Sequence, residues 1–143
     1  MSNDYFVQPL LEELKTSDNP LHLAYKAQYL SGRVGFDFES LHDAFGKVKE
    51  ECLEIEEALH QPKIDREHLL EEIGDGFFAL TNLARQAGVD PEELIYQATH
   101  KYLKRVEYIE ERLKEQNKNW QDATFEEMDS YWDEAKVAGK KYS

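Results

Sequence analysis

Two pairs of acidic residues carry the strongest chemical signal in this sequence. Glu51 and Glu54 form one pair, and Glu72 and Asp75 form the other. Residues three positions apart lie on the same face of a helix, so each pair presents two carboxylates together if its segment is helical. Oxygen ligands favour a hard cation, Mg²⁺ above all with Mn²⁺ as an alternative, and such an ion leaves positions open for water and phosphate. The spacing therefore predicts a divalent-metal site.

The two pairs are expected to meet because the connection between their segments is short. Residues 61–64 join segments that we expect to be helices, so the two helices should form an antiparallel hairpin. Glu54 and Glu72 are equidistant from position 63, and so are Glu51 and Asp75. Four carboxylates at one level repel one another unless a cation lies between them. The competing interpretation is a solvated helix face, which is common in a chain with 30 acidic residues.

Basic and aromatic residues recur at helical spacing elsewhere in the chain. Lys101 and Arg105 are four residues apart, as are Trp132 and Lys136, and Lys47 lies one turn before the first acidic pair. A triphosphate needs metal ions on some of its oxygens and Lys or Arg on others. Taken singly, each of these cations is more often a surface residue. Together with the acidic pairs, they indicate a site for a polyphosphate.

Other phosphate and metal motifs fit this sequence less well. The Gly46-Lys47 dipeptide has no glycine five positions before it and is followed by valine, so it is not a P-loop. A di-iron bundle needs two Glu-x-x-His motifs, whereas only Glu57-x-x-His60 is present. These two classes of site are therefore not expected.

Composition limits the partners. The net charge of −13 argues against a nucleic-acid polymer, because proteins that bind one carry a basic surface. No apolar stretch reaches the length of a membrane span, and the opening MSNDYFVQPL lacks the features of a signal peptide. A single cysteine, Cys52, excludes an internal disulfide and favours a reducing cytoplasm.

The elements that must position these residues are all expected to be helices in one domain over residues 1–143. Asn19-Pro20 and Asp90-Pro91 are typical helix starts, and no segment alternates with the period of a strand. Apolar residues on the third and fifth helices form stripes that we expect to be core, and Cys52 belongs to the first stripe. The architecture predicted is an antiparallel helical bundle. The helices are expected at about 4–16, 20–31, 40–60, 65–87, 91–117 and 125–138.

The sequence resembles the MazG family of nucleoside triphosphate pyrophosphohydrolases, within the all-α NTP pyrophosphatase group. The resemblance extends over about 100 of the 143 residues. The matching segments are Gly35-Phe36-Asp37, Lys47 through Glu54, Glu71-Glu72-Ile73-Gly74-Asp75, Phe78 through Arg85, Lys101 through Arg105 and Trp132 through Lys136. Two residues depart from the family pattern. Gly76 stands in mid-helix where a large apolar residue is usual, at a cost of about 1 kcal/mol in helix stability, and His68 stands where a long cation is common.

The resemblance implies a MazG-like helical bundle completed by at least dimerisation, and hydrolysis of NTPs or dNTPs between the α- and β-phosphates. It also implies roles for individual residues. Glu51, Glu54, Glu72 and Asp75 would hold magnesium. Asn82 and Trp132 would lie near the nucleoside. The other substrate-binding positions would be Lys47, Glu50, Glu71, Lys101, Arg105 and Lys136.

Glu51 is our candidate for the group that orients or deprotonates the attacking water, although Glu50 beside it is not excluded by the sequence. The alternative function is a non-catalytic helical module that binds nucleotides or a partner through a degenerate site. All four carboxylates and the basic residues are present, which favours catalysis. The preferred base and sugar are left open.

Overall fold

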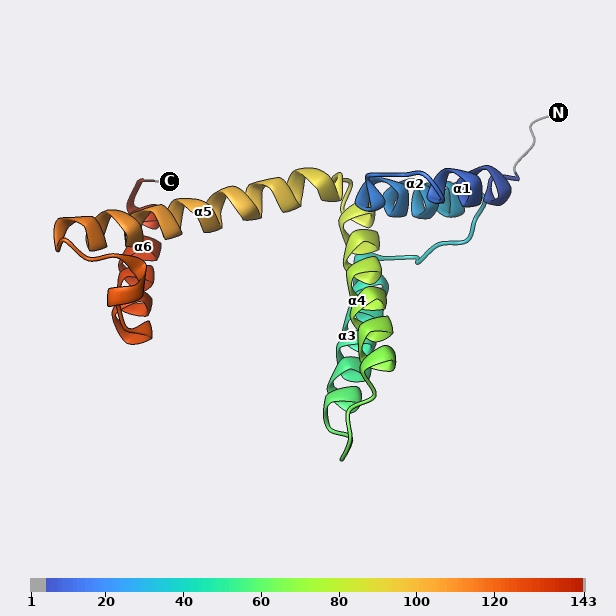
Figure 1. Cartoon of the computed structure of the whole chain (residues 1–143). Coiled ribbons are helices and arrows are strands. Elements are labelled where there is room, and N and C mark those ends of the chain that lie inside the picture. Colours follow the sequence, from blue (N-terminus) through green and yellow to red (C-terminus); the bar gives the residue numbers. More distant parts are fainter. Residues whose placement is uncertain (1–4, 143) are drawn as a thin grey trace. The chain divides into compact units, whose positions relative to one another are not determined.

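The computed structural model describes residues 5–142, with side chains through residue 139, and this part of the chain is helical without strands (Figure 1). The all-α prediction is confirmed, and the expected helix ends lie within about four residues of those observed. No helix in the described range combines the length and apolar character that a membrane crossing requires. The helices are α1 (Val7–Leu14), α2 (Pro20–Arg33), α3 (Leu41–Leu59), α4 (Arg66–Gln86), α5 (Pro91–Glu115) and α6 (Phe125–Tyr142), with a short 3₁₀ helix, η1 (Trp120–Asp122), before α6.

Side chains at the helix starts explain why the elements begin where they do. The Asn19 and Ser40 side chains each accept a hydrogen bond of 3.1 Å from the backbone N–H three residues later. Asp65 and Thr124 do the same at 3.3 and 3.1 Å. Each cap satisfies one of the backbone donors that a helix leaves free at its N-terminus. Most of the helix starts are therefore encoded locally.

The chain divides into two compact units, one through Leu94 and one from Ile95 onward, so the boundary falls inside α5. In the first unit, α3 and α4 form the antiparallel hairpin with the most extensive contact, α2 packs on α4, and α1 packs on α2. The second unit holds the rest of α5 with η1 and α6. A single domain over the whole chain stays a prediction.

The apolar stripe expected as core on α3 is only partly buried. Val48 is buried, but Cys52 is exposed, and Leu41, Phe45 and Leu59 are each about half exposed. The buried positions of α3 are Ala44, Val48, Glu51 and Ala58. The stripe that faces α4 is therefore rotated toward the acidic residues, and small alanines let the two helices approach closely. The prediction that Cys52 lies in the core of this chain is wrong.

The core of the second unit is aromatic and centred on α5 and α6. Ile109, Leu113 and Tyr131 are buried together, with Trp120 and Trp132 packed against them. The C-terminal half of the predicted α5 stripe is thus core, whereas Ile95 and Tyr102 in its N-terminal half are exposed. Tyr102 nonetheless contacts the Trp132 ring, with 5.6 Å between the ring centroids.

Candidate active site

Three of the four predicted metal-binding carboxylates come together on the α3–α4 hairpin. Glu51, Glu72 and Asp75 each have a carboxylate oxygen within 4.8 Å of the others. The antiparallel hairpin explains the match, because residues equidistant from the turn at 60–65 face each other across the two helices. Glu51 is only 6% exposed, which is unusual for a glutamate. The structure therefore groups a buried carboxylate, Glu51, with the partly buried Glu72 and the exposed Asp75.

The surroundings of Glu72 raise the pKa of its carboxyl. Burial raises the pKa of the Glu72 carboxyl, and the nearby Glu54, Asp75 and Glu51 raise it further. His68, whose Nδ1 lies 3.8 Å from Glu72 Oε1, opposes this shift when it is protonated. The charged form of Glu72 is thus disfavoured by its surroundings, which is the condition that a bound cation would relieve. Glu54 is half-buried and contributes to this field without belonging to the closest group.

Lys47, one turn before Glu51 on α3, forms an ion pair with the Glu51 carboxylate. Lys47 Nζ lies 3.1 Å from Glu51 Oε1 and 3.5 Å from Glu50 Oε1. The hydrogen bond to Glu51 is the main cause of a raised pKa at Lys47, with the charge of Glu50 adding to it. Lys47 therefore stays cationic and fixes one oxygen of the buried carboxylate.

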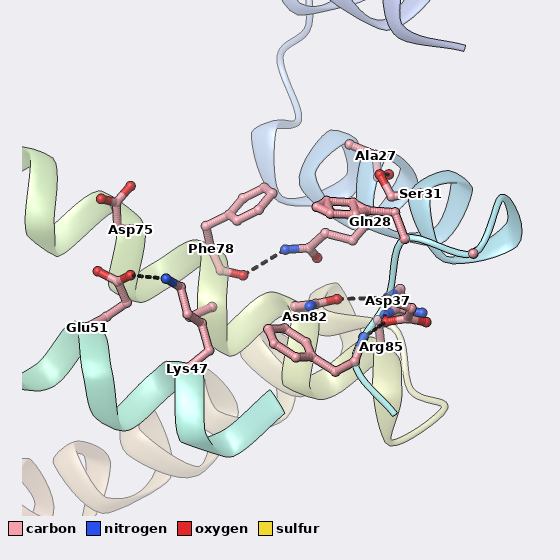
Figure 2. Close-up of a pocket in the computed structure, with 14 residues that line it drawn as sticks. Ala27, Gln28, Ser31, Asp37, Lys47, Glu51, Asp75, Phe78, Asn82 and Arg85 are labelled. Carbon is pink, nitrogen blue, oxygen red and sulfur yellow. Dashed lines mark hydrogen bonds and ion pairs between the residues drawn. The ribbon is translucent and has the colours of Figure 1, made fainter. Parts of the chain in front are cut away.

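A cavity of about 620 Å³ opens beside these carboxylates, a size typical of small-molecule sites. Glu51, Asp75 and Lys47 form one end of it, and the Asn82 and Arg85 side chains lie at the other end, as Figure 2 shows. The remaining lining residues are Ala27, Gln28, Ser31, Gly35, Phe36, Asp37, Phe38, Phe78 and Ala79. The cavity thus joins an acidic end to an end with amide, guanidinium and aromatic groups.

The loop between α2 and α3 is tied to the end of α4 and closes the second end of the cavity. Arg85 Nη2 donates to Asp37 Oδ1 at 2.5 Å, and Gln86 Nε2 donates to the same oxygen at 2.8 Å. Arg85 is the main cause of a lowered pKa at the Asp37 carboxyl. A Cβ on Gly32 would lie 2.7 Å from Asp37 Oδ2, so this glycine leaves the space that the ion pair occupies. Gly35 in the same loop has φ +93°, which few other residues adopt.

The predicted phosphate-binding cations of the second unit also gather. Lys101, Arg105 and Lys136 line a hollow of about 400 Å³ together with Lys104. The Arg105 guanidinium lies 5.3 Å from the centre of a Trp132 ring, which restrains it by a cation–π contact. The second unit thus presents a basic surface backed by an aromatic side chain.

Three predicted substrate-binding residues line neither hollow, namely Glu50, Glu71 and Trp132. Glu50 and Glu71 are exposed, and neither lines the cavity. Glu50 contacts only Lys47 among the ion pairs of the described residues. Their role in substrate binding stays a prediction.

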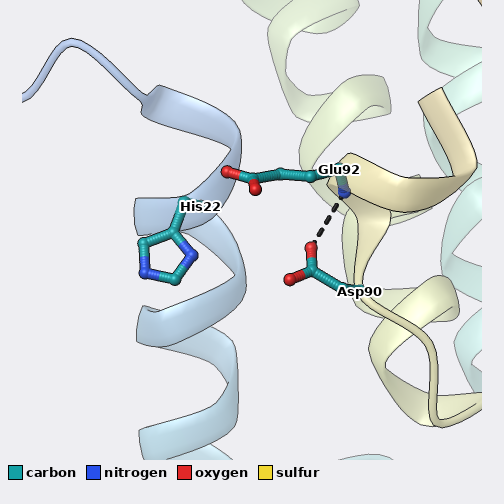
Figure 3. A group of neighbouring side chains, drawn as sticks. All are labelled: His22, Asp90 and Glu92. Atoms are coloured by element: carbon teal, nitrogen blue, oxygen red, sulfur yellow. Dashed lines mark hydrogen bonds between the residues drawn. The ribbon is translucent and has the colours of Figure 1, made fainter. Parts of the chain in front are cut away.

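A second group with metal-ligand types has another explanation. His22, Asp90 and Glu92 have potential ligand atoms within 4.8 Å of one another (Figure 3). Asp90 Oδ1 accepts the Glu92 N–H at 2.9 Å at the start of α5, and the Asn19 side chain, which caps α2, contacts the Glu92 carboxylate. Helix capping accounts for Asp90 and Glu92 without a ligand. They differ in this from the Glu51 group, whose members cap no helix.

Comparison with known proteins agrees with this geometry. Residues 39–109 match the model of the MazG nucleotide pyrophosphohydrolase domain. The chain carries a MazG-family domain. The matched range contains the carboxylates of α3 and α4 together with Lys101 and Arg105, and it ends before Trp132.

Curated relatives of this MazG-family chain are longer proteins. It is 34% identical over 116 residues to the nucleoside triphosphate pyrophosphohydrolase/pyrophosphatase MazG of Thermotoga maritima, covering 81% of this chain and 44% of that protein. It is 31% identical over 126 residues to the nucleoside triphosphate pyrophosphohydrolase of Escherichia coli K12, covering 88% of this chain and 48% of that protein. It also matches the uncharacterized protein YabN of Bacillus subtilis, at 41% over 76 residues, or 52% of this chain and 16% of that protein. The chain thus spans less than half the length of these relatives.

Several cavity residues of this MazG-family chain were not found as site residues from the sequence. Gln28, buried on α2, and Arg85, paired with Asp37, had no predicted role. The signal for Gln28 is weak, since it is one polar residue on a helix face that also carries buried Leu23. Asp37 and Arg85 lie in the segments that resemble the family, but their pairing across 48 residues depends on how α2 packs on α4.

Proposed function

We propose that this chain hydrolyses nucleoside or deoxynucleoside triphosphates to the monophosphate and pyrophosphate, by attack of water at the α-phosphate. The observation that supports this most strongly is the buried Glu51, grouped with Glu72 and Asp75 at one end of a cavity large enough for a nucleotide. The similarity to relatives named as nucleoside triphosphate pyrophosphohydrolases points to the same reaction.

The carboxylate group fits magnesium, with manganese as the alternative. Its donors are all oxygens. Burial, together with the neighbouring carboxylates, raises the pKa of Glu72, and a divalent cation would stabilise its charged form. Glu51, Glu72 and Asp75 would bind the ion directly, and Glu54 would complete the set of ligands. Bound magnesium would lower the pKa of the attacking water and neutralise the pyrophosphate leaving group.

The chain's own residues then have distinct tasks. Glu51, fixed by Lys47, orients the attacking water and accepts its proton. Lys101, Arg105 and Lys136, which line one hollow of the second unit, are assigned to phosphate binding.

The nucleoside is assigned to the end of the cavity away from the carboxylates. Asn82 lies at that end. The place of Trp132 near the nucleoside stays a prediction, and its ring contacts Arg105 and Tyr102. The single exposed Cys52 is compatible with a reducing cytoplasm as the setting.

A second copy of the chain is proposed to complete the bundle. The hairpin leaves large apolar side chains exposed on both of its helices, whereas soluble monomers rarely expose contiguous apolar faces. The described core of the first unit is mostly alanine and leaves much apolar surface uncovered. The exposed residues of the hairpin include Leu41, Phe45, Leu53, Leu59, Leu70, Phe77, Phe78 and Leu80.

Product analysis tests the reaction. The purified protein is expected to convert at least one triphosphate to monophosphate and pyrophosphate, to lose this activity in EDTA and to regain it with magnesium. Orthophosphate and nucleoside diphosphate as the primary products would contradict the cleavage position. Nucleotide binding without any turnover would favour the alternative, a non-catalytic helical module.

A further inference from the structure

Two side-chain amides in the cavity are each held in one orientation. Gln28 Nε2 donates to the backbone carbonyl of Phe78 at 2.8 Å. A carbonyl only accepts, so the amide nitrogen must face Phe78 and the oxygen must face away from it. Gln28 is only 6% exposed, and no donor of the described residues reaches its Oε1. The cavity wall therefore contains a buried acceptor without a partner among the described residues.

Asn82 is fixed with the opposite polarity. Its Oδ1 accepts a hydrogen bond of 2.9 Å from Arg85 Nε, and Arg85 is itself held by Asp37. A guanidinium only donates, so the oxygen of Asn82 must face Arg85 and its NH₂ group is left for another partner. Asn82 lines the same cavity as Gln28 (Figure 2). One end of the cavity thus combines an acceptor of fixed orientation, Gln28 Oε1, with a donor of fixed orientation, Asn82 Nδ2.

We propose that Gln28 and Asn82 select the nucleobase through its hydrogen-bonding edge. Gln28 Oε1 accepts an N–H of the base, and Asn82 Nδ2 donates to a neighbouring carbonyl oxygen or ring nitrogen. This inference rests on the proposed function, because it places the base at the end of the cavity opposite the carboxylates. The substrate class is a nucleotide whose base carries a donor next to an acceptor.

The surroundings of the two amides suit a base. Phe36, Phe38 and Phe78 line the cavity, and flat aromatic rings favour stacking with a base. A buried acceptor left unpaired is costly, so a base N–H that reaches Gln28 Oε1 gains more than a surface hydrogen bond would. The oxygen has almost no exposed surface, so a base reaches it only when neighbouring side chains move. Exposed rings such as Phe36 and Phe78 can rotate to admit it.

Methylated substrates test the acceptor. The kcat/KM of pyrophosphate release is measured for UTP against 3-methyluridine triphosphate and for ATP against its N6,N6-dimethyl derivative, starting from whichever parent the wild type cleaves faster. Methylation removes the N–H donor. The kcat/KM of the wild type is therefore expected to be about tenfold or more lower for the methylated substrate, because a site built for a hydrogen bond discriminates against an analogue that lacks it. Gln28→Met should cleave the parent and the methylated substrate with similar kcat/KM. Any general loss from imperfect folding cancels in this ratio.

Gln61→Met is the matched control, because Gln61 Nε2 also donates to a helix carbonyl, that of Glu57 at 3.1 Å, far from the cavity lining. This variant should keep the wild-type ratio. Equal cleavage of both substrates by the wild type, or the same ratio in Gln28→Met as in the wild type, would overturn the role of Gln28 while leaving the proposed reaction intact. If the wild type releases pyrophosphate from no triphosphate, the proposed function itself fails and this inference fails with it.

Asn82→Asp tests the donor. Aspartate has the same shape and keeps an oxygen for Arg85, but it replaces the NH₂ group by a second acceptor. KM for the parent substrate is expected to rise about tenfold with a smaller change in kcat, since a lost contact to the base weakens binding in the ground and transition states alike. An unchanged KM in a folded Asn82→Asp protein would show that this amide does not contact the base.

Discussion

Glu72 illustrates how a single residue reports on the whole acidic group. Its pKa is raised by burial and then by three neighbouring carboxylates. In the metal-free protein, the surroundings of Glu72 therefore disfavour its charged form. Replacing one of these carboxylates by its amide, which has the same shape, should therefore not lower the stability of the metal-free protein.

The substitutions Glu54→Gln and Asp75→Asn test this directly. Each should leave the melting temperature of the metal-free protein unchanged or higher, because like-charge repulsion falls. Activity should fall by orders of magnitude. Magnesium at a hundredfold excess over its dissociation constant should stabilise the wild type by about 2.7 kcal/mol and the variants by much less. Melting curves and activity are measured on the same preparation.

If the acids form only a solvated helix face, magnesium will hardly move any melting curve and activity will survive. Glu56→Gln serves as the matched control, since Glu56 is exposed on the same helix and lies outside the acidic group. It should respond to magnesium as the wild type does.

The cations of the second unit carry a separate prediction. Lys101→Ala and Arg105→Ala should reduce turnover of a triphosphate without unfolding the protein, because Lys101 is exposed and Arg105 is half-buried outside the core. A nucleoside diphosphate lacks the terminal phosphate, so its binding should suffer less from these changes. Binding constants measured for both ligands on each variant check this. Equal losses for the two ligands would mean that these cations do not contact the terminal phosphate.

At the scale of elements, local signals in the sequence predicted more than long-range ones. Caps such as Asn19 and Ser40 act within three residues, so the helix starts followed from the sequence. The meeting of Glu51 with Asp75 followed from hairpin symmetry and a short turn. The Asp37–Arg85 pair and the place of Gln28 depend instead on packing between α2 and α4, which no local pattern encodes.

At Gly76 on α4, an alanine substitution tests helix propensity and the packing against α3 separately. A Cβ at this position would lie 3.5 Å from Ile55 Cδ1, an ordinary van der Waals contact. Gly76→Ala should therefore stabilise the protein by about 1 kcal/mol through helix propensity, with no steric penalty. Denaturant titration measures the free energy of unfolding.

Gly74→Ala is the control for this change, because a Cβ there would meet nothing within 4 Å. It should give the propensity gain alone. A loss of stability in Gly76→Ala beside a gain in Gly74→Ala would show that α3 and α4 approach more closely than the structure indicates.

At the scale of the molecule, the stripe expected as core on α3 is only partly buried in the described chain. The periodicity of Leu41, Phe45 and Leu59 shows that one helix face is apolar, but not whether the same chain covers it. In the described chain these residues stay half exposed, while alanines and Glu51 face α4. A sequence pattern cannot distinguish a face buried within one chain from a face that awaits a second copy.

The proposed assembly makes the last prediction. Leu53, 59% exposed on α3, lies on the uncovered hairpin, and Leu53→Glu would place a charge in any interface formed there. Burying a leucine side chain contributes about 1.5–3 kcal/mol, and a two-fold interface contains the change twice. The dimer should therefore weaken roughly a hundredfold or more, since each 1.4 kcal/mol is a factor of ten. Sedimentation of the wild type should show at least a dimer, and that of Leu53→Glu a monomer at the same concentration. Val137→Glu, at an exposed valine of α6, should keep the wild-type assembly. A monomeric wild type at micromolar concentration would mean that the apolar hairpin face is covered by something other than a second copy.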